Sequence, residues 1–241
     1  MPGPLEFALV ALFSVAWPLY TQFVTWPRYL ARFRAGVPGA RLGLYRLTLA
    51  EQWGLAAAVV LLWVRAGRPW AALGLRAAEG WRAWLAYGLV AAITLLFAQQ
   101  LRKVAARPAV RERLRPRLQA LDPMLPHSPA EFRTFLALSV TAGICEELLF
   151  RGMFIWTLQP WIGTWGAGIL GAILFGVAHS YQGRAGAIRA GVGGVVMTAV
   201  YLVSGSLIPG MVLHAIVDIG SGGTAWLALR DETPKPVVAT A

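Results

Sequence analysis

The chain has 241 residues, of which 57% are hydrophobic and 14% are charged, and its mean hydropathy is +0.58. This composition excludes an ordinary soluble domain and is typical of a membrane protein with several transmembrane segments. The net charge of +11 comes from basic residues concentrated in loops between apolar runs, so we expect these residues to face lipid headgroups and expect no nucleic-acid binding.

Seven apolar runs follow one another along the chain, each near the roughly 20 residues that cross a bilayer. They lack the period-two alternation of a membrane β-barrel. We therefore predict an all-α fold, a polytopic transmembrane helix bundle of about seven spans with the active site in the last four. The predicted spans cover residues 5–24, 47–64, 84–101, 132–158, 165–181, 187–203 and 207–229.

This pattern divides the chain into three parts. Residues 1–131 are expected to hold three transmembrane helices and a basic cytoplasmic segment, residues 132–229 the last four spans, and residues 230–241 a cytoplasmic tail. Within the first part, residues 102–117 are predicted to form an interfacial helix that ends at a proline-rich turn. Glycines crowd residues 163–194 and predict close helix packing there.

The loops alternate between strongly and weakly basic. Seventeen arginines and lysines fall on one side of the predicted spans, and four, Arg65, Arg68, Arg76 and Arg82, fall on the other. Because cytoplasmic loops carry the excess of Lys and Arg, we predict a multi-pass protein of the cell membrane with its N-terminus outside and its C-terminus in the cytoplasm. The stretch 65–82 also fits a segment that lies along the membrane surface.

Three charged residues interrupt the fourth predicted span. Each ionisable group at the bilayer centre costs about 2.5–3.5 kcal/mol on insertion scales, so such residues are expected to be paired and functional. Glu147 and Arg151 are four residues apart and share a helix face, whereas Glu146 points about 100° away. We predict a structural ion pair between Glu147 and Arg151, which leaves Glu146 available as a general base.

Two further polar motifs lie in later spans. His179 ends the fifth span and is a candidate to share a water molecule with Glu146, although a simple hydrogen bond to a carbonyl oxygen is the alternative. His214 and Asp218 are four residues apart in the last span, where the acid can orient the imidazole on the same helix face. Such a pair can donate hydrogen bonds to a developing oxyanion.

Together these motifs resemble those of the CPBP intramembrane proteases, which include CAAX prenyl endopeptidases of the Rce1 type and bacteriocin-processing or self-immunity relatives. The resemblance covers residues 139–222 and rests on Glu146-Glu147-x-x-x-Arg151, Phe175-x-x-x-His179 and His214-x-x-x-Asp218. It implies an endopeptidase in which Glu146 and His179 activate a water molecule while His214 and its partner hold the oxyanion. That partner is usually asparagine in the prenyl endopeptidases. Because an ionised aspartate cannot donate a hydrogen bond, we expect Asp218 to orient His214.

Four alternatives stay open at this point, and one of them is a proton-coupled carrier that uses the same intramembrane charges. Glu146, His179, His214 and Asp218 are all acceptable zinc ligands, so a zinc-dependent variant stands beside the mechanism without a required cofactor that the resemblance implies. Cys145 could act as a thiol nucleophile, and a non-catalytic scaffold or immunity-type factor could use the same polar network. The expected partners are a peptide or membrane-protein substrate and the lipid bilayer, and the sequence indicates no oligomeric state.

Overall fold

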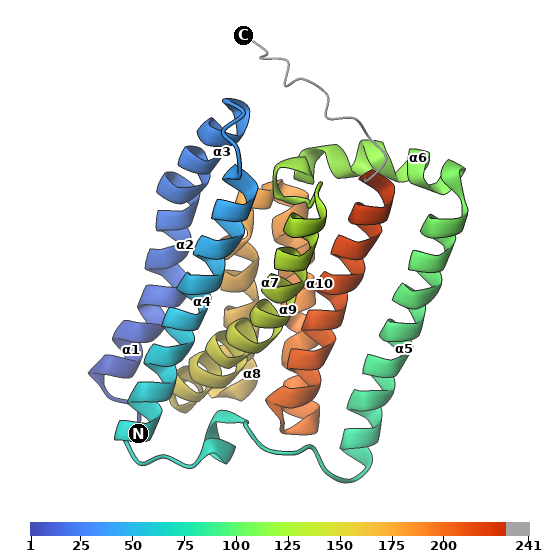
Figure 1. The fold of residues 1–241 in the computed structure, drawn as a ribbon. Helices are drawn as coiled ribbons and strands as arrows, with labels where there is room; N and C mark the ends of the chain where they lie inside the picture. The colour runs from blue at the N-terminus through green and yellow to red at the C-terminus, as the bar shows by residue number, and fades with distance from the viewer. Residues whose placement is uncertain (230–241) are drawn as a thin grey trace.

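The computed structural model describes residues 1–229, and in this range the chain forms helices and no strand. The prediction of an all-α transmembrane bundle is therefore confirmed. Long helices stand side by side, and the shorter α6 crosses one end of the bundle (Figure 1). The α-helices are α1 Pro4–Ala11, α2 Trp17–Tyr20, α3 Trp26–Arg34, α4 Ala40–Arg65, α5 Gly80–Ala106, α6 Pro108–Leu118, α7 Pro129–Glu147, α8 Phe154–Ala178, α9 Gly183–Ser204 and α10 Leu207–Leu229.

Turns of π-helix join several of these elements into longer rods. The π turns Leu12–Ala16 and Thr21–Thr25 connect α1, α2 and α3 into one first helix, and Leu148–Met153 connects α7 to α8. Pro18 and Pro27 lie just after the first two π turns, where their missing N–H groups interrupt the regular helical ladder. The third π turn contains Arg151 and follows Glu146 and Glu147 directly.

Within residues 1–229, six helical stretches are long and apolar enough to cross a membrane, and the longest, Pro129–Ala178, has 50 residues. A straight helix of that length would measure about 75 Å, far more than the roughly 30 Å of the hydrocarbon core. The chain reverses within it at Gly163, whose φ of 71° lies in the left-handed region that favours glycine. Gly171 consequently packs against Phe154. The stretch forms two spans, and the resulting total of seven agrees with the prediction.

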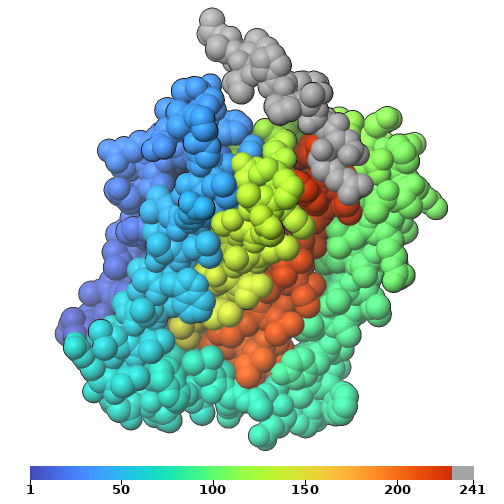
Figure 2. Space-filling model, viewed as in Figure 1, coloured from blue at the N-terminus to red at the C-terminus, as the bar shows by residue number. Residues whose placement is uncertain are grey.

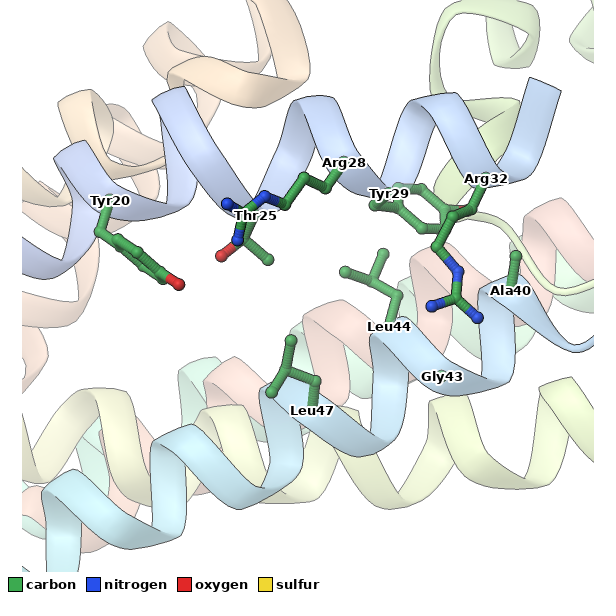
Figure 3. Close-up of a pocket in the computed structure, with 9 residues that line it drawn as sticks. All are labelled: Tyr20, Thr25, Arg28, Tyr29, Arg32, Ala40, Gly43, Leu44 and Leu47. Carbon is green, nitrogen blue, oxygen red and sulfur yellow. The ribbon is translucent and has the colours of Figure 1, made fainter. Parts of the chain in front are cut away.

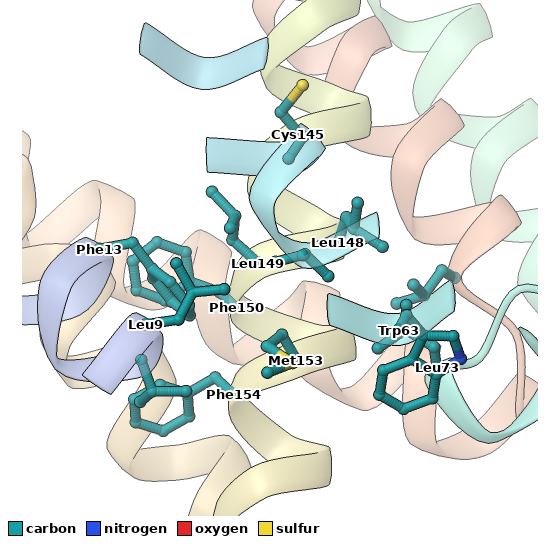
Figure 4. Packing of buried hydrophobic residues seen from close by; sticks show 14 of the residues in the cluster. Leu9, Phe13, Trp63, Leu73, Cys145, Leu148, Leu149, Phe150, Met153 and Phe154 are labelled. Carbon is teal, nitrogen blue, oxygen red and sulfur yellow. The ribbon is translucent and has the colours of Figure 1, made fainter. Parts of the chain in front are cut away.

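The first helix packs against α4 and the α7–α8 rod through a buried apolar cluster (Figure 4). The rings of Phe13 and Phe150 meet edge to face with their centroids 5.4 Å apart, and those of Trp63 and Trp156 meet in the same way at 4.8 Å. Because lipid is as apolar as these side chains, their close fit, rather than exclusion of water, holds the helices together.

Helix α10 packs against α5, α7 and α9, and it reaches the surface between α7 and α5 (Figure 2). Its approach to α7 depends on Gly143, where an added Cβ would lie 2.7 Å from the backbone oxygen of Met211. In the same way, Gly176 of α8 faces the backbone of Gly191 in α9. The predicted close packing at small residues occurs between α8 and α9. The equally close contact at Gly143 brings the polar residues of α7 and α10 within reach of each other.

The basic loops gather at one end of the bundle. The turn between α3 and α4, helix α6 and the end of α10 lie there, whereas the N-terminus and the α4–α5 connection lie at the other end (Figure 1). Arg115 of α6 donates to the carbonyl oxygen of Ala228 in α10 at 3.0 Å. The predicted basic helix exists, but it begins at Pro108 rather than at residue 102, because proline suits the first turn of a helix and ends the preceding one. Orientation in the membrane stays a prediction, and the predicted cytoplasmic tail, residues 230–241, lies outside the described residues.

The connection between α4 and α5 is anchored to the protein. Leu73 is fully buried, the Leu207 N–H donates to the carbonyl oxygen of Gly74 at 2.8 Å, and Arg76 Nε donates to that of Gly205 at 2.8 Å. These contacts hold the connection against the turn between α9 and α10. That the stretch 65–82 lies along a membrane surface stays a prediction, as does the orientation of the chain in the membrane.

Candidate active site

The most deeply buried charged residues among residues 1–229 are Glu147 and Arg151, whose side chains are each 1% exposed. Arg151 Nη1 lies 3.1 Å from Glu147 Oε1, and Arg151 Nη2 donates to the carbonyl oxygen of Gly194 in α9 at 3.1 Å. The guanidinium also lies 4.7 Å from the ring centre of Phe175 in α8. An unpaired charge in such a place would cost several kcal/mol, so this ion pair both neutralises the two charges and joins α7, α8 and α9.

His214 of α10 gives Glu147 a second partner. Its Nδ1 lies 2.8 Å from Glu147 Oε1, and because a carboxylate can only accept, Nδ1 carries the proton of this hydrogen bond. The ring is thereby fixed with Nε2 directed at the remaining acids, 3.8 Å from Glu146 Oε2 and 3.8 Å from Asp218 Oδ2. Both distances are longer than a hydrogen bond, so His214 Nε2 is not hydrogen-bonded to either acid.

Glu146 is held differently from Glu147. Its Oε1 accepts a hydrogen bond of 2.7 Å from Nε2 of Gln52 in α4. Its Oε2 is buried, and among the described residues it has no hydrogen-bond partner. One carboxylate oxygen is thus fixed by a neutral amide, while the other points toward His214 with its lone pairs unused.

Asp218 forms the more open side of the cluster. Its side chain is 38% exposed, compared with 10% for His214 and 15% for Glu146. It lies one helical turn beyond His214 on the same face of α10, and it interacts electrostatically with Glu146, Glu147, His214 and His179. Of the side chains of Asp218, His214 and Glu146, that of Asp218 is the most exposed at the surface of the molecule.

His179 caps the end of α8 and is half-buried. Its Nδ1 lies 2.8 Å from the carbonyl oxygen of Phe175, which is the simple hydrogen bond that sequence analysis set against a catalytic role. Since a carbonyl oxygen only accepts, this bond leaves Nε2 as the free ring atom. The Phe175 ring lies between the two histidines, 4.5 Å from His179 and 6.0 Å from His214 between ring centroids. No hydrogen bond joins His179 to Glu146 within residues 1–229.

Gln52 is the site residue that sequence analysis missed. A signal was present, because Glu51 and Gln52 are polar residues inside the apolar run 47–64 and polar residues at membrane depth are functional candidates. The adjacent Trp53 donates from its indole Nε1 to Thr141 Oγ1 at 3.1 Å. Two polar contacts from adjacent residues of α4 therefore tie this helix to α7 at the level of the cluster.

A metal site and a thiol nucleophile are the two alternative chemistries that this cluster could provide. In the part of the chain that the structure describes, no three His, Cys, Asp or Glu side chains lie close enough together to hold a metal ion. As arranged, the four candidate zinc ligands are thus too widely spread to share one metal ion. Cys145 is fully buried in the apolar cluster among Leu148, Leu149 and their neighbours, an environment in which a thiol is usually inert.

Fold and site together define a multi-pass membrane protein with a buried acid–imidazole cluster shared by four helices. Residues 128–220 match the family model described as Type II CAAX prenyl endopeptidase Rce1-like. This match confirms the predicted family resemblance over residues 128–220, which make up less than half of the chain. No curated protein and no solved structure shows significant similarity to the chain. The match includes Glu146, His179, His214 and Asp218, but Gln52 lies outside it.

Proposed function

We propose that the protein is an intramembrane endopeptidase of the CAAX prenyl protease type, which hydrolyses a peptide bond near the C-terminus of a membrane-attached substrate or within a membrane-embedded segment. The proposal rests on the hydrogen bonding of the two carboxylate oxygens of Glu146. One of its oxygens is fixed by Gln52 at 2.7 Å, and the other is free and faces His214. A carboxylate held in this way is suited to take a proton from water.

In the proposed reaction, Glu146 accepts a proton as the oxygen of that water molecule attacks the peptide carbonyl carbon. A C–O bond forms, and the carbonyl oxygen becomes an oxyanion. The C–N bond then breaks, and the proton held by Glu146 passes to the departing amine. The free ring atom of His179 is Nε2. We propose that this atom hydrogen-bonds to the same water molecule and helps Glu146 to activate it.

His214 is proposed to stabilise the oxyanion. Its Nδ1 is committed to Glu147, so only Nε2 can serve the substrate, and in the imidazolium form this atom carries an N–H that can donate. Glu147 and Arg151 are positioning residues in this proposal because they fix the ring and are themselves fully buried. Asp218, 3.8 Å from Nε2, supports the charged form of His214 and takes no direct part in binding the oxyanion.

Gln52 is proposed as a further positioning residue. Its amide is the donor that fixes Oε1 of Glu146, so it determines which way Oε2 points. Because α4 lies outside the segment that matches the family model, the proposed site depends on the N-terminal half of the chain as well as on that segment.

The test is the variant Glu146→Gln, assayed with an internally quenched farnesylated peptide that ends in a CAAX sequence. Glutamine keeps the shape of Glu146 and can still accept the Gln52 hydrogen bond, but it cannot take a proton from water. We expect cleavage to fall at least about 100-fold, the scale of a lost general base. The control is Glu51→Gln, which removes the acid that precedes Gln52 in α4 and leaves Glu146 in place. This variant should retain activity.

Comparison of membrane proteomes extends this test to substrates other than the farnesylated peptide. A C-terminal fragment that appears with the wild-type protein and not with Glu146→Gln would support the peptidase. A cellular phenotype that survives Glu146→Gln would instead favour the non-catalytic scaffold or immunity-type factor. The Glu147–Arg151–His214 network supports that second candidate in one respect, since it joins four helices whether or not a reaction takes place.

A further inference from the structure

A cavity of about 280 Å³ lies between the first helix and α4, apart from the acid–imidazole cluster. Its walls come from α2 and α3 on one side and from α4 on the other (Figure 3). All of its lining residues precede the segment that matches the family model. The residues that matter here are Tyr20, Arg28, Arg32, Gly43, Leu44 and Leu47.

Two arginines one helical turn apart line this cavity, and no acidic residue is among the residues that line it. Arg32 extends toward Ala40 and Gly43 of α4, whereas Arg28 extends along the first helix toward Thr25 (Figure 3). Both are exposed, and within residues 1–229 neither has a hydrogen-bond or ion-pair partner. By contrast, Arg41 at the same end of the bundle is paired with Glu131 at 3.2 Å. The cavity therefore presents two positive charges that an anion could neutralise.

The remaining wall is apolar and aromatic. Leu44 and Leu47 point from α4 toward the first helix, and the ring of Tyr20 borders the cavity at the end away from Arg32 (Figure 3). Leu47 and Tyr20 are 45% and 46% exposed, as expected for side chains that face lipid. Positive charge at the basic end of the bundle and apolar surface toward its middle match the order of charged and apolar groups in a phospholipid.

We propose that this cavity binds the headgroup of an anionic phospholipid, with the phosphate between Arg28 and Arg32 and the acyl chains passing Tyr20 and Leu47 into the bilayer. Arginine suits phosphate because its planar guanidinium donates two parallel hydrogen bonds. Basic pockets between transmembrane helices are recognised sites for such headgroups. The volume is slightly below the roughly 300–1,000 Å³ of small-molecule pockets, which suits a headgroup with its chains outside. This inference does not depend on peptidase activity.

The experiment uses the full-length protein in detergent with equal amounts of phosphatidylglycerol and phosphatidylcholine, and native mass spectrometry counts each bound lipid. For Arg28→Gln/Arg32→Gln we expect the preference for phosphatidylglycerol to fall about 30-fold. The control Arg184→Gln/Arg189→Gln removes the same charge from two exposed arginines of α9 and should change the preference by less than about threefold. Equal losses in the two double variants would overturn the proposal.

A second variant separates the cavity from general surface charge. A Cβ at Gly43 would meet no atom within 4 Å, so Gly43→Leu should fold normally while it fills part of the cavity and leaves every charge in place. We expect this variant to lose the preference as well, and undiminished phosphatidylglycerol binding would overturn the proposed site. Displacement of the lipid by millimolar inorganic phosphate would also overturn it, since the site would then be one for a soluble anion.

Discussion

Replacement of Gln52 by methionine tests how the proposed base is held. Methionine is close to glutamine in length and volume, but it lacks the amide donor, whose Nε2 lies 2.7 Å from Glu146 Oε1. A hydrogen bond to a charged group contributes about 1.5–3 kcal/mol, and each 1.4 kcal/mol or so corresponds to tenfold in rate. If the whole bond contributes to the transition state, kcat/KM should fall about 10- to 150-fold.

The loss is expected in kcat. Gln52 contacts the carboxylate that activates water and makes no proposed contact with substrate, so KM should change by no more than about twofold. Both constants are measured with the quenched farnesylated peptide, and thermal unfolding is followed in the same detergent.

A matched control is Gln100→Met, which removes another interhelical amide bond, from Gln100 Nε2 of α5 to Thr224 Oγ1 of α10 at 3.0 Å. This bond joins neutral groups outside the cluster, and its loss should leave kcat nearly unchanged. The reasoning would be refuted if Gln52→Met kept wild-type activity, if it raised KM alone, or if Gln100→Met lowered kcat to the same extent.

Three further predictions follow from the packing and charges around the site. Arg151→Met removes one partner of the buried ion pair and should lower the free energy of unfolding by about 3–5 kcal/mol; equal melting temperatures for this variant and for Arg184→Met, which changes an exposed arginine, would contradict it. Gly143→Leu introduces a side chain where a Cβ would already come within 2.7 Å of the α10 backbone, so it should lower both Tm and kcat. Gly88→Leu on α5, where a Cβ meets nothing within 4 Å, should lower neither. Because the candidate ligands are too spread to hold a metal ion, activity should survive chelation and zinc should be substoichiometric by elemental analysis. Activity lost on chelation and restored by zinc would instead establish the zinc-dependent alternative.

The fold was predictable because each span is a continuous apolar run, and such runs depend on local composition alone. Boundaries were less predictable where the backbone departs from a regular helix. The segment Leu148–Met153 is a π turn, although the spacing of Glu147 and Arg151 was interpreted as that of an α-helix. The two side chains still meet at 3.1 Å, because both lie on the side of the rod that faces α8, α9 and α10.

The candidate site was predictable only where its contacts are local. The four-residue spacings of Glu147 with Arg151 and of His214 with Asp218 are visible in the sequence. The contact of Gln52 with Glu146 joins residues 94 apart, and that of His214 with Glu147 joins residues 67 apart. No periodic pattern encodes such pairs, because they depend on how closely whole helices approach. For α7 and α10, that approach is set by a glycine.

The participation of α4 bears on how a site of this kind can vary. The matched segment, residues 128–220, supplies the acids and histidines, whereas the donor that fixes Glu146 comes from α4. A change in α4 can therefore redirect the free oxygen of Glu146 without altering any motif residue. The proposed lipid cavity lies on the same helix, nearer the basic end, with Leu47 only five residues before Gln52. A bound headgroup that shifted α4 along α7 would act on the Gln52–Glu146 hydrogen bond, so lipid composition and catalytic rate should be coupled through this helix and uncoupled in Gln52→Met.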